Sequence, residues 1–277
     1  MSKERGIRPL FLTVLVLALI AGSIAAVYLL MPRGNTAVPA PTMPERKAVP
    51  PEKLLTEGKK LYSQFDEELV IRHFFKDRQG GVFIDVGCAW PIHCSTTYYL
   101  EKHLGWTGIG IDAQEFYREA WEANRPNSKF FAYAVTDHAG DRMTFYTPPN
   151  AGRGLASLSR EYLEKWDVTE PIETEVETIT LNKLLEDNGI SNFDFLSMDI
   201  EGAEVDALKG FDIERFRPSL CCVEIQKENV DVVHKYFADH GYTCLKHYRK
   251  YDKVNWYFAP AEEAPPDDTA ATSEETP

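Results

Sequence analysis

Four carboxylates stand at or next to the ends of short apolar runs that are typical of buried strands. Asp85, Asp112 and Asp199 lie at the ends of the first, second and fourth of these runs, and Glu224 lies near the end of a later one. In an open α/β sheet, ligands bind beyond the carboxyl ends of the strands. A single acid at such a place more often caps a helix or forms a turn. Three of them bordering one crevice favour a binding site.

The first of these ends indicates what kind of ligand the crevice takes. Gly87 follows Asp85 and Val86, and a glycine after a strand lets the backbone approach a ligand closely. Asp112 ends the second run, where an acid in nucleotide-binding folds accepts hydrogen bonds from ribose hydroxyls. The pattern G-x-G-x-x-G, which places a pyrophosphate at a helix N-terminus, does not occur here. A nicotinamide dinucleotide is therefore disfavoured, and S-adenosylmethionine, a nucleoside cofactor without phosphate, fits better.

The elements that must position these residues follow from hydrophobic periodicity. We expect strands at 82–86, 107–112, 130–135, 193–199 and 220–225, and helices at 95–104, 115–124, 181–187, 203–208 and 229–240. Extended pieces at 143–146 and 173–179 and a hairpin of 242–247 with 255–258 complete residues 80–259. This alternation predicts an α/β fold, a mostly parallel sheet with helices on both faces. Residues 53–79 precede it, and their pattern predicts one amphipathic helix over 53–77 that packs on the domain.

The two ends of the chain differ from this middle part. Within 1–31, three basic residues precede a long uncharged run, which predicts a single-pass membrane anchor; a cleaved signal peptide is the alternative. Residues 32–52 carry six prolines and predict an extended linker, and the acidic tail 260–277 is expected to be disordered. The basic flank weakly favours a domain outside the cytosol, whereas the cofactor is cytosolic, so the side stays open.

Charge and cysteine content exclude other classes of protein. The chain carries 43 acidic and 30 basic residues, a formal charge of −13, and no basic stripe, so we expect no nucleic-acid partner. Five cysteines leave one over from any disulfide framework, and none has the paired C-x-x-C spacing of a zinc site.

Residues 80–258 resemble the FkbM-type S-adenosylmethionine-dependent methyltransferases. The resemblance is carried by VFIDVG, GIGIDA, AVTDHAG, ETITLNKLL, DFLSMDIEGAEVDALKG, CVEIQ and GYTCLKHYRKYDKVNWYF, in this order. It implies a Rossmann-like seven-stranded sheet and O-methylation of a hydroxyl on a sugar, glycan or metabolite. This chain departs from the family's pattern at Trp90-Pro91-Ile92-His93, where a second glycine is usual, and at Asn182, where an Asp is common.

The resemblance also implies roles for eight residues of this chain. The cofactor's methionine end would meet Asp85 and Gly87, its ribose Asp112, and its adenine Ala134 and Val135. The acceptor side would be formed by Asp199, Glu201 and Glu204.

The acids at the acceptor side could act in several ways. Asp199 or Glu201 would orient or deprotonate the acceptor hydroxyl, because an alcohol is a weak nucleophile. The same acids with Glu204 could bind a divalent cation, which we expect less, or Glu201 and Glu204 could cap the helix near Ala203. His93 and His138 are weaker candidates for the base, and segment 151–159 is either a lid or an ordinary connection. Two other functions stay open, an inactive membrane-tethered binding module and an oxidoreductase.

Overall fold

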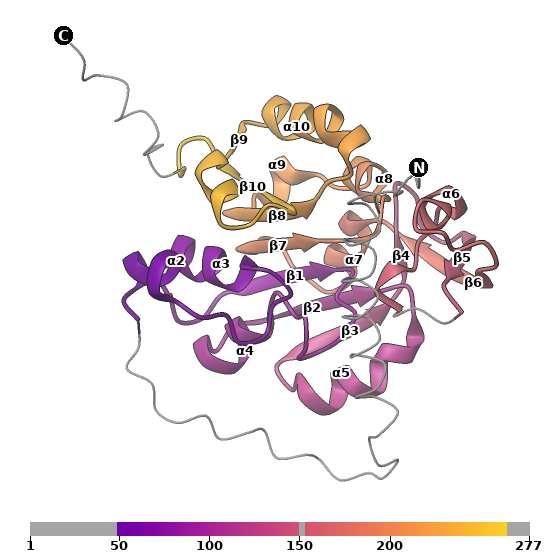
Figure 1. The fold of residues 1–277 in the computed structure, drawn as a ribbon, viewed down its shortest axis with the longest axis horizontal. Helices are drawn as coiled ribbons and strands as arrows, with labels where there is room; N and C mark the ends of the chain where they lie inside the picture. Colours follow the sequence, from indigo (N-terminus) through magenta and orange to yellow (C-terminus); the bar gives the residue numbers. More distant parts are fainter. Residues whose placement is uncertain (1–48, 150–152, 265–277) are drawn as a thin grey trace, which may run out of the picture.

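The computed structural model describes residues 49–149 and 153–264, and a seven-stranded sheet forms its centre (Figure 1). Within these residues the strands lie in the spatial order β3 (Ser128–Ala132), β2 (Thr107–Asp112), β1 (Val82–Val86), β7 (Phe195–Met198), β8 (Leu220–Glu224), β10 (Asn255–Pro260) and β9 (Tyr242–Cys244). Neighbours from β3 to β8 pair in parallel, and β10 pairs antiparallel with both β8 and β9. The mostly parallel sheet and its C-terminal antiparallel element confirm the predicted fold class.

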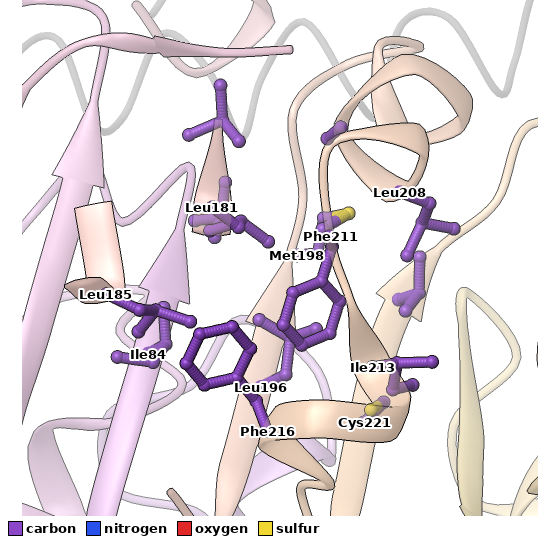
Figure 2. Close-up of a cluster of buried hydrophobic side chains, with 14 of the residues drawn as sticks. Ile84, Leu181, Leu185, Leu196, Met198, Leu208, Phe211, Ile213, Phe216 and Cys221 are labelled. Atoms are coloured by element: carbon purple, nitrogen blue, oxygen red, sulfur yellow. The ribbon is translucent and has the colours of Figure 1, made fainter. Parts of the chain in front are cut away.

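Both faces of the sheet are covered, which explains why its central strands are apolar at almost every position. One core joins alternate residues of β1, β7 and β8 to α7 (Leu181–Asp187), α8 (Glu204–Lys209), α9 (Ile213–Phe216) and α10 (Val230–Asp239). The other joins the intervening residues to α3 (Glu67–Phe75) and α4 (Tyr98–Leu104). In β7, Leu196 and Met198 enter the first core and Phe195 the second. Figure 2 shows Leu196 beside Phe216 in the first core.

A second sheet stands beside the first and contains three strands of the described residues. Its order is β4 (Ala134–Val135), β6 (Ile172–Ile179) and β5 (Arg142–Thr147). The predicted strand 130–135 is therefore wrong as one element. The chain leaves β3 after Ala132, and Ala134 and Val135 pair with β6 instead. The turn η3 (Arg153–Leu155) and α6 (Arg160–Glu164) lie between β5 and β6 in sequence.

The predicted helix over 53–77 is also wrong. The structure has a turn η1 (Pro51–Lys53), α2 (Leu54–Glu57), and then no helix until α3. Gly58 ends α2 with extended backbone, and Leu61 and Phe65, whose spacing suggested a helix, are exposed. The carboxylate of Glu68 accepts hydrogen bonds from the backbone N–H groups of Leu61 and Tyr62. Acids at the start of α3 thus bind the preceding backbone and fix the helix start there.

The remaining elements connect the strands. They are η2 (Glu115–Tyr117) with α5 (Arg118–Asn124) after β2, η4 (Lys227–Asn229) before α10, and η5 (Lys246–Lys250) between β9 and β10. The helix expected from residue 95 begins at Tyr98, although Ser95 does accept a hydrogen bond from the Tyr98 N–H.

The predicted boundaries at the two ends meet the structure only in part. Pro260 pairs with Tyr242 as the last residue of β10, so the tail does not begin at residue 260. Most of the predicted tail, the anchor within 1–31 and most of the linker 32–52 lie outside the described residues. Within residues 49–149 and 153–264, no helix has both the length and the apolar character that crossing a membrane requires.

Candidate active site

A pocket opens at the carboxyl ends of β1, β2 and β7, where the sheet order reverses. The chain runs outward from β1 to β2 and β3 and then returns to β7 on the other side of β1. Open α/β sheets bind ligands at such switch points. Counting the space open to solvent, the pocket measures about 530 Å³. Six of the eight predicted site residues line it, namely Gly87, Asp112, Ala134, Val135, Asp199 and Glu201.

Gly87 is required by the neighbouring strand as well as by any ligand. Its φ is +81°, and a Cβ at this position would come 1.7 Å from the carbonyl oxygen of Asp199. Its N–H donates to the Ile111 carbonyl at 2.8 Å. A side chain at residue 87 would therefore push β1 away from the loop after β7.

Asp112 faces the pocket with its carboxylate already fixed. One oxygen accepts the Gln114 N–H at 2.8 Å and the other the Ala89 N–H at 3.2 Å. Burial raises the pKa of Asp112 to about 6, although these two backbone hydrogen bonds oppose the rise. Each oxygen of a carboxylate can accept a second hydrogen bond. Asp112 is thus pre-oriented and still able to bind hydroxyl groups of a ligand.

Asp85 does not line the pocket, contrary to the expectation from the resemblance. It lies two residues after Phe83 in β1 and so on the same face of the strand, the face that α4 covers. There its carboxylate accepts a 2.6 Å hydrogen bond from the Thr97 hydroxyl. The Thr97 hydroxyl in turn accepts a 3.0 Å hydrogen bond from Arg125. Asp85 is therefore part of a buried polar network beneath the pocket.

Arg125 holds the loop between β1 and α4 in this network. Its buried guanidinium donates to Glu101 at 2.6 Å and to the Pro91 carbonyl at 3.1 Å, and it lies 4.3 Å from the Trp121 ring. The second glycine that is usual in the family's pattern is absent from residues 90–93 of this chain. Backbone with positive φ stands on both sides of these residues, at Ala89 with φ +39° and at Cys94 with φ +58°, and the Ala89 carbonyl accepts the indole N–H of Trp121 at 2.9 Å. Side-chain contacts support a turn that glycine would otherwise favour.

The wall beside Asp112 is largely apolar. Ala134 and Val135 are buried and line the pocket as expected, because β4 turns away from β3 there. They are joined by Ile111, Tyr133 and Phe145. A flat apolar ring would be desolvated against this wall.

The other end of the pocket gathers acids from two strands. Side-chain oxygens of Asp199, Glu201 and Glu224 lie within 4.8 Å of one another. We refer to these three residues as the acid cluster. Oxygens at this spacing suit a divalent cation, but acids also cluster without one, and we assign no metal.

The pKa values of the acid cluster are raised. Burial, followed by repulsion from Asp199, raises the pKa of Glu201 to about 8, while a hydrogen bond from Tyr162 lowers it. Burial and repulsion from Glu201 raise the pKa of Glu224 to about 7. Asp199 is accessible through the pocket, yet protein atoms surround its carboxylate, and this loss of water and the nearby Glu224 raise its pKa. Such carboxyls are better matched to proton transfer near neutral pH than ordinary ones.

Glu204 is not part of the acid cluster, so the expectation that it faces the acceptor does not hold. Its side chain is buried, and one oxygen accepts the N–H groups of Ile200 at 3.1 Å and Gly202 at 3.2 Å. It therefore braces the loop that carries Glu201. That loop is strained, because Glu201 itself has a φ of +54°.

Two residues that support Glu201 were not among the predicted site residues. Both lie in the segment between β5 and β6, which we call the β5–β6 excursion. Tyr162 donates a hydrogen bond to Oε2 of Glu201, and Ser157 donates to the Glu201 carbonyl at 2.8 Å. No motif marks either residue, because their partner lies about 40 positions away. Glu224 had a visible signal, an acid near a strand end, but nothing local showed that it would meet Asp199.

The remaining candidates lie away from the pocket lining. His93 and His138 are exposed, and His138 bonds Asp137 at 2.6 Å. Of the segment proposed as a lid, residues 150–152 lie outside the described residues. Gly154, Ala156 and Leu158 line the pocket. The segment thus borders the site, and whether it moves stays a prediction.

Comparison with known proteins places this geometry in a family. A model described as "Methyltransferase FkbM domain" matches residues 83–244. No curated protein matches the sequence significantly. Among solved structures, a "putative RNA methyltransferase" of Pyrococcus horikoshii is 12% identical with a TM-score of 0.35. The match covers 70% of this chain and 81% of the Pyrococcus chain. Precorrin-6y C5,15-methyltransferase of Geobacter metallireducens is 11% identical with a TM-score of 0.34, covering 64% and 70%. Both similarities are weak, so the fold class rests on this chain's own sheet.

Proposed function

We propose, from the premise that this chain belongs to the FkbM methyltransferase domain family, that it uses S-adenosylmethionine to methylate a hydroxyl group on a sugar, glycan or other metabolite. The observation that carries the proposal is one pocket with two chemically different ends. Asp112 and the apolar wall stand at one end, and Asp199 and Glu201 stand at the other. This is the arrangement that a nucleoside cofactor and a weakly acidic acceptor require together.

The residues of the pocket fit the cofactor. Asp112 retains acceptor capacity for two ribose hydroxyls, and Ala134 and Val135 offer an apolar surface to adenine. Among the described residues, none of the acid cluster forms an ion pair with Lys, Arg or His. Carboxyls without a cationic partner are, in their ionised form, stabilised by a positively charged group nearby. When bound, S-adenosylmethionine supplies a methyl group activated by a sulfonium.

The acid cluster would act on the acceptor. Glu201 or Asp199 accepts the proton of the acceptor hydroxyl, and Asp199 and Glu224 hold hydroxyl groups beside it. Raised pKa values make these carboxyls more effective proton acceptors. Fixing the hydroxyl in line with the methyl group contributes a further large part of the rate.

Calorimetric titration of the purified protein with S-adenosylmethionine tests the first half of the proposal. Methyl transfer from labelled S-adenosylmethionine to a panel of glycosides, polyols, phenols and amines tests the second half. We expect binding, and transfer to at least one hydroxylated compound that is lost in Asp199→Asn. Asp206→Asn is the matched control, because Asp206 is an exposed acid of α8 that pairs with Lys209. Binding without any transfer would support the inactive tethered module, and nicotinamide binding would support the oxidoreductase.

We also propose that residues 1–31 tether the domain to a membrane as a single-pass anchor. What supports this is the length of the uncharged run and the basic residues before it. Full-length protein should sediment with membranes after carbonate washing, whereas a chain lacking residues 1–31 should not. A shortened mature protein in the supernatant would identify a signal peptide instead.

A further inference from the structure

We propose that Tyr162 is a positioning residue that holds the carboxylate of Glu201 toward the acceptor. The inference rests on the proposed methyltransferase function and adds a residue that lies outside the pocket lining. It is carried by the contacts between two distant segments, the excursion that contains α6 and the loop after β7.

Tyr162 meets Glu201 with its hydroxyl. The side chain is buried, and its O–H donates to Oε2 of Glu201. Gln226 approaches the same hydroxyl at 3.5 Å and Oε2 of Glu224 at 3.3 Å. With Oε2 of Glu201 held in this way, Oε1 is the oxygen left to receive the proton of the acceptor.

The ring of Tyr162 also packs against the loop. A Cβ on Gly202 would lie 3.2 Å from Cδ2 of Tyr162, so only a glycine lets ring and backbone meet without displacement. Gly202 has a φ of +100° and Glu201 one of +54°, which is an unfavourable conformation for a residue with a side chain. Contacts from outside the loop are needed to keep Glu201 in this conformation.

Tyr162 is itself fixed by its own segment. Ser159 caps α6 and accepts the Tyr162 N–H at 3.1 Å, and Ser157 pairs with the backbone of Tyr146 in β5. Ser157 also donates to the Glu201 carbonyl at 2.8 Å. The segment between β5 and β6 therefore donates hydrogen bonds to both the backbone and the side chain of Glu201.

Tyr162 acts as a donor and not as the base. Burial and the nearby Glu201 raise the pKa of Tyr162 above its usual value, so the hydroxyl stays protonated. During transfer the acceptor oxygen would bond to the methyl carbon as the carbon–sulfur bond of the sulfonium breaks and leaves a neutral thioether, and the proton of the acceptor hydroxyl would pass to Glu201. The hydrogen bond from Tyr162 stabilises the charged form of Glu201 and so keeps it available as the acceptor of that proton.

Tyr162→Phe tests the inference, with Tyr242→Phe as the matched control. Tyr242 is also buried and loses a 2.8 Å hydrogen bond to the Pro218 carbonyl, but it lies in β9 and is not a pocket residue. Carbon-13 NMR of labelled glutamate carboxyls, with Glu201 assigned from Glu201→Gln, follows its titration without any acceptor. We expect the Glu201 midpoint to rise by about one pH unit in Tyr162→Phe only.

Kinetics with the best acceptor of the panel provide the second readout. In Tyr162→Phe, kcat should fall about 10- to 100-fold, and the acidic limb of its pH profile should move to higher pH. Affinity for S-adenosylmethionine should stay within about twofold, because Tyr162 does not line the pocket. An unchanged Glu201 midpoint, or an unchanged pH profile in an active enzyme, would overturn the positioning role. If wild-type protein transfers no methyl group, the proposed function fails, and the NMR titration still reports on the Tyr162 contact.

Discussion

The two ends of the pocket treat their carboxylates differently. At the end of β2, Asp112 lines the pocket and accepts hydrogen bonds from the backbone N–H groups of Ala89 and Gln114. Outside the pocket lining, Asp85 of β1 accepts one from Thr97. At the ends of β7 and β8, the acid cluster brings three carboxyls together with few donors. The first end is satisfied before any ligand arrives, whereas the second keeps electrostatic repulsion that a proton or a cationic ligand relieves.

This difference suits the two roles that we propose. A fixed carboxylate can select a constant ligand, such as a ribose, without rearrangement. Carboxyls with raised pKa values can exchange protons during a reaction. Substitutions at the two ends should therefore affect different measurements.

The largest expected effect is at the acid cluster. Asp199→Asn should lower kcat about 100-fold or more, because it removes a charge that orients or deprotonates the acceptor. The dissociation constant for S-adenosylmethionine should change much less. Steady-state kinetics and calorimetry on the same preparations measure both, and an equal loss of cofactor binding would remove the proposed division between the two ends.

Next in size is the buried network beneath the pocket. Thr97→Val keeps the shape of the side chain but removes the hydroxyl that donates to Asp85 and accepts from Arg125, so the buried carboxylate of Asp85 loses its 2.6 Å hydrogen bond. The free energy of unfolding should fall by about 2–3 kcal/mol. Urea denaturation measures it, with Thr144→Val, whose hydroxyl bonds Glu175 on the surface, as a control that should cost less than about 0.5 kcal/mol. Equal costs would show that Asp85 is not held as described.

A smaller effect is expected at the satisfied end. Asp112→Asn should weaken binding of S-adenosylmethionine about tenfold, since one charged acceptor for ribose hydroxyls is lost. Turnover at saturating cofactor should be nearly normal. Asp187→Asn, an exposed acid that pairs with Lys183, is the control for loss of one charge. A large fall in kcat with unchanged affinity would place Asp112 at the reacting end instead.

The stability of the free protein should fall as the pH rises at both ends of the pocket, but over a different pH range at each end. A carboxyl whose pKa is raised on folding contributes stability that is present below its unfolded value, and that stability is lost as the pH rises through its folded value. For Glu201 this window runs from about 4.5 to about 8, and for Asp112 from 3.8 to about 6.

The melting temperature should therefore fall by a few degrees between pH 5 and pH 8. Glu201→Gln should remove part of the fall above pH 6, whereas Asp112→Asn should alter only the part below it. Differential scanning fluorimetry across this range gives the comparison. A melting temperature that rises toward pH 8 would contradict the raised pKa values.

The smallest expected effect concerns the turn at Ala89. Ala89→Gly relieves a positive φ but increases the freedom of the unfolded chain, so the free energy of unfolding should change by less than about 1 kcal/mol. Ala120→Gly, within α5, should cost about 1 kcal/mol. Chemical denaturation of both variants separates the two positions, and a larger loss at Ala89 would show that its methyl group, and not the network, supports the turn.

Much of the fold and part of the site follow from local sequence. Alternating apolar runs and helical patterns predicted the mostly parallel sheet, because periods of 2 and 3.6 residues are properties of short segments. Gly87 and Asp112 were found because they adjoin strand ends, and strand ends of a parallel sheet share one edge. The helix over 53–77 failed for the complementary reason, since the spacing of Leu61 and Phe65 could not reveal that Glu68 binds the backbone before it.

The tertiary structure alone decided which way the acids point and which of them meet. Asp85 turned out to share the face of Phe83 and to enter a network with Arg125, because alternate residues of a strand face opposite sides. Glu224 and Tyr162 reached Asp199 and Glu201 only through strand pairing and an excursion that no local pattern encodes. Sequence fixes which groups stand at the edge of the sheet, and packing between distant segments fixes their partners, their exposure and so their charge.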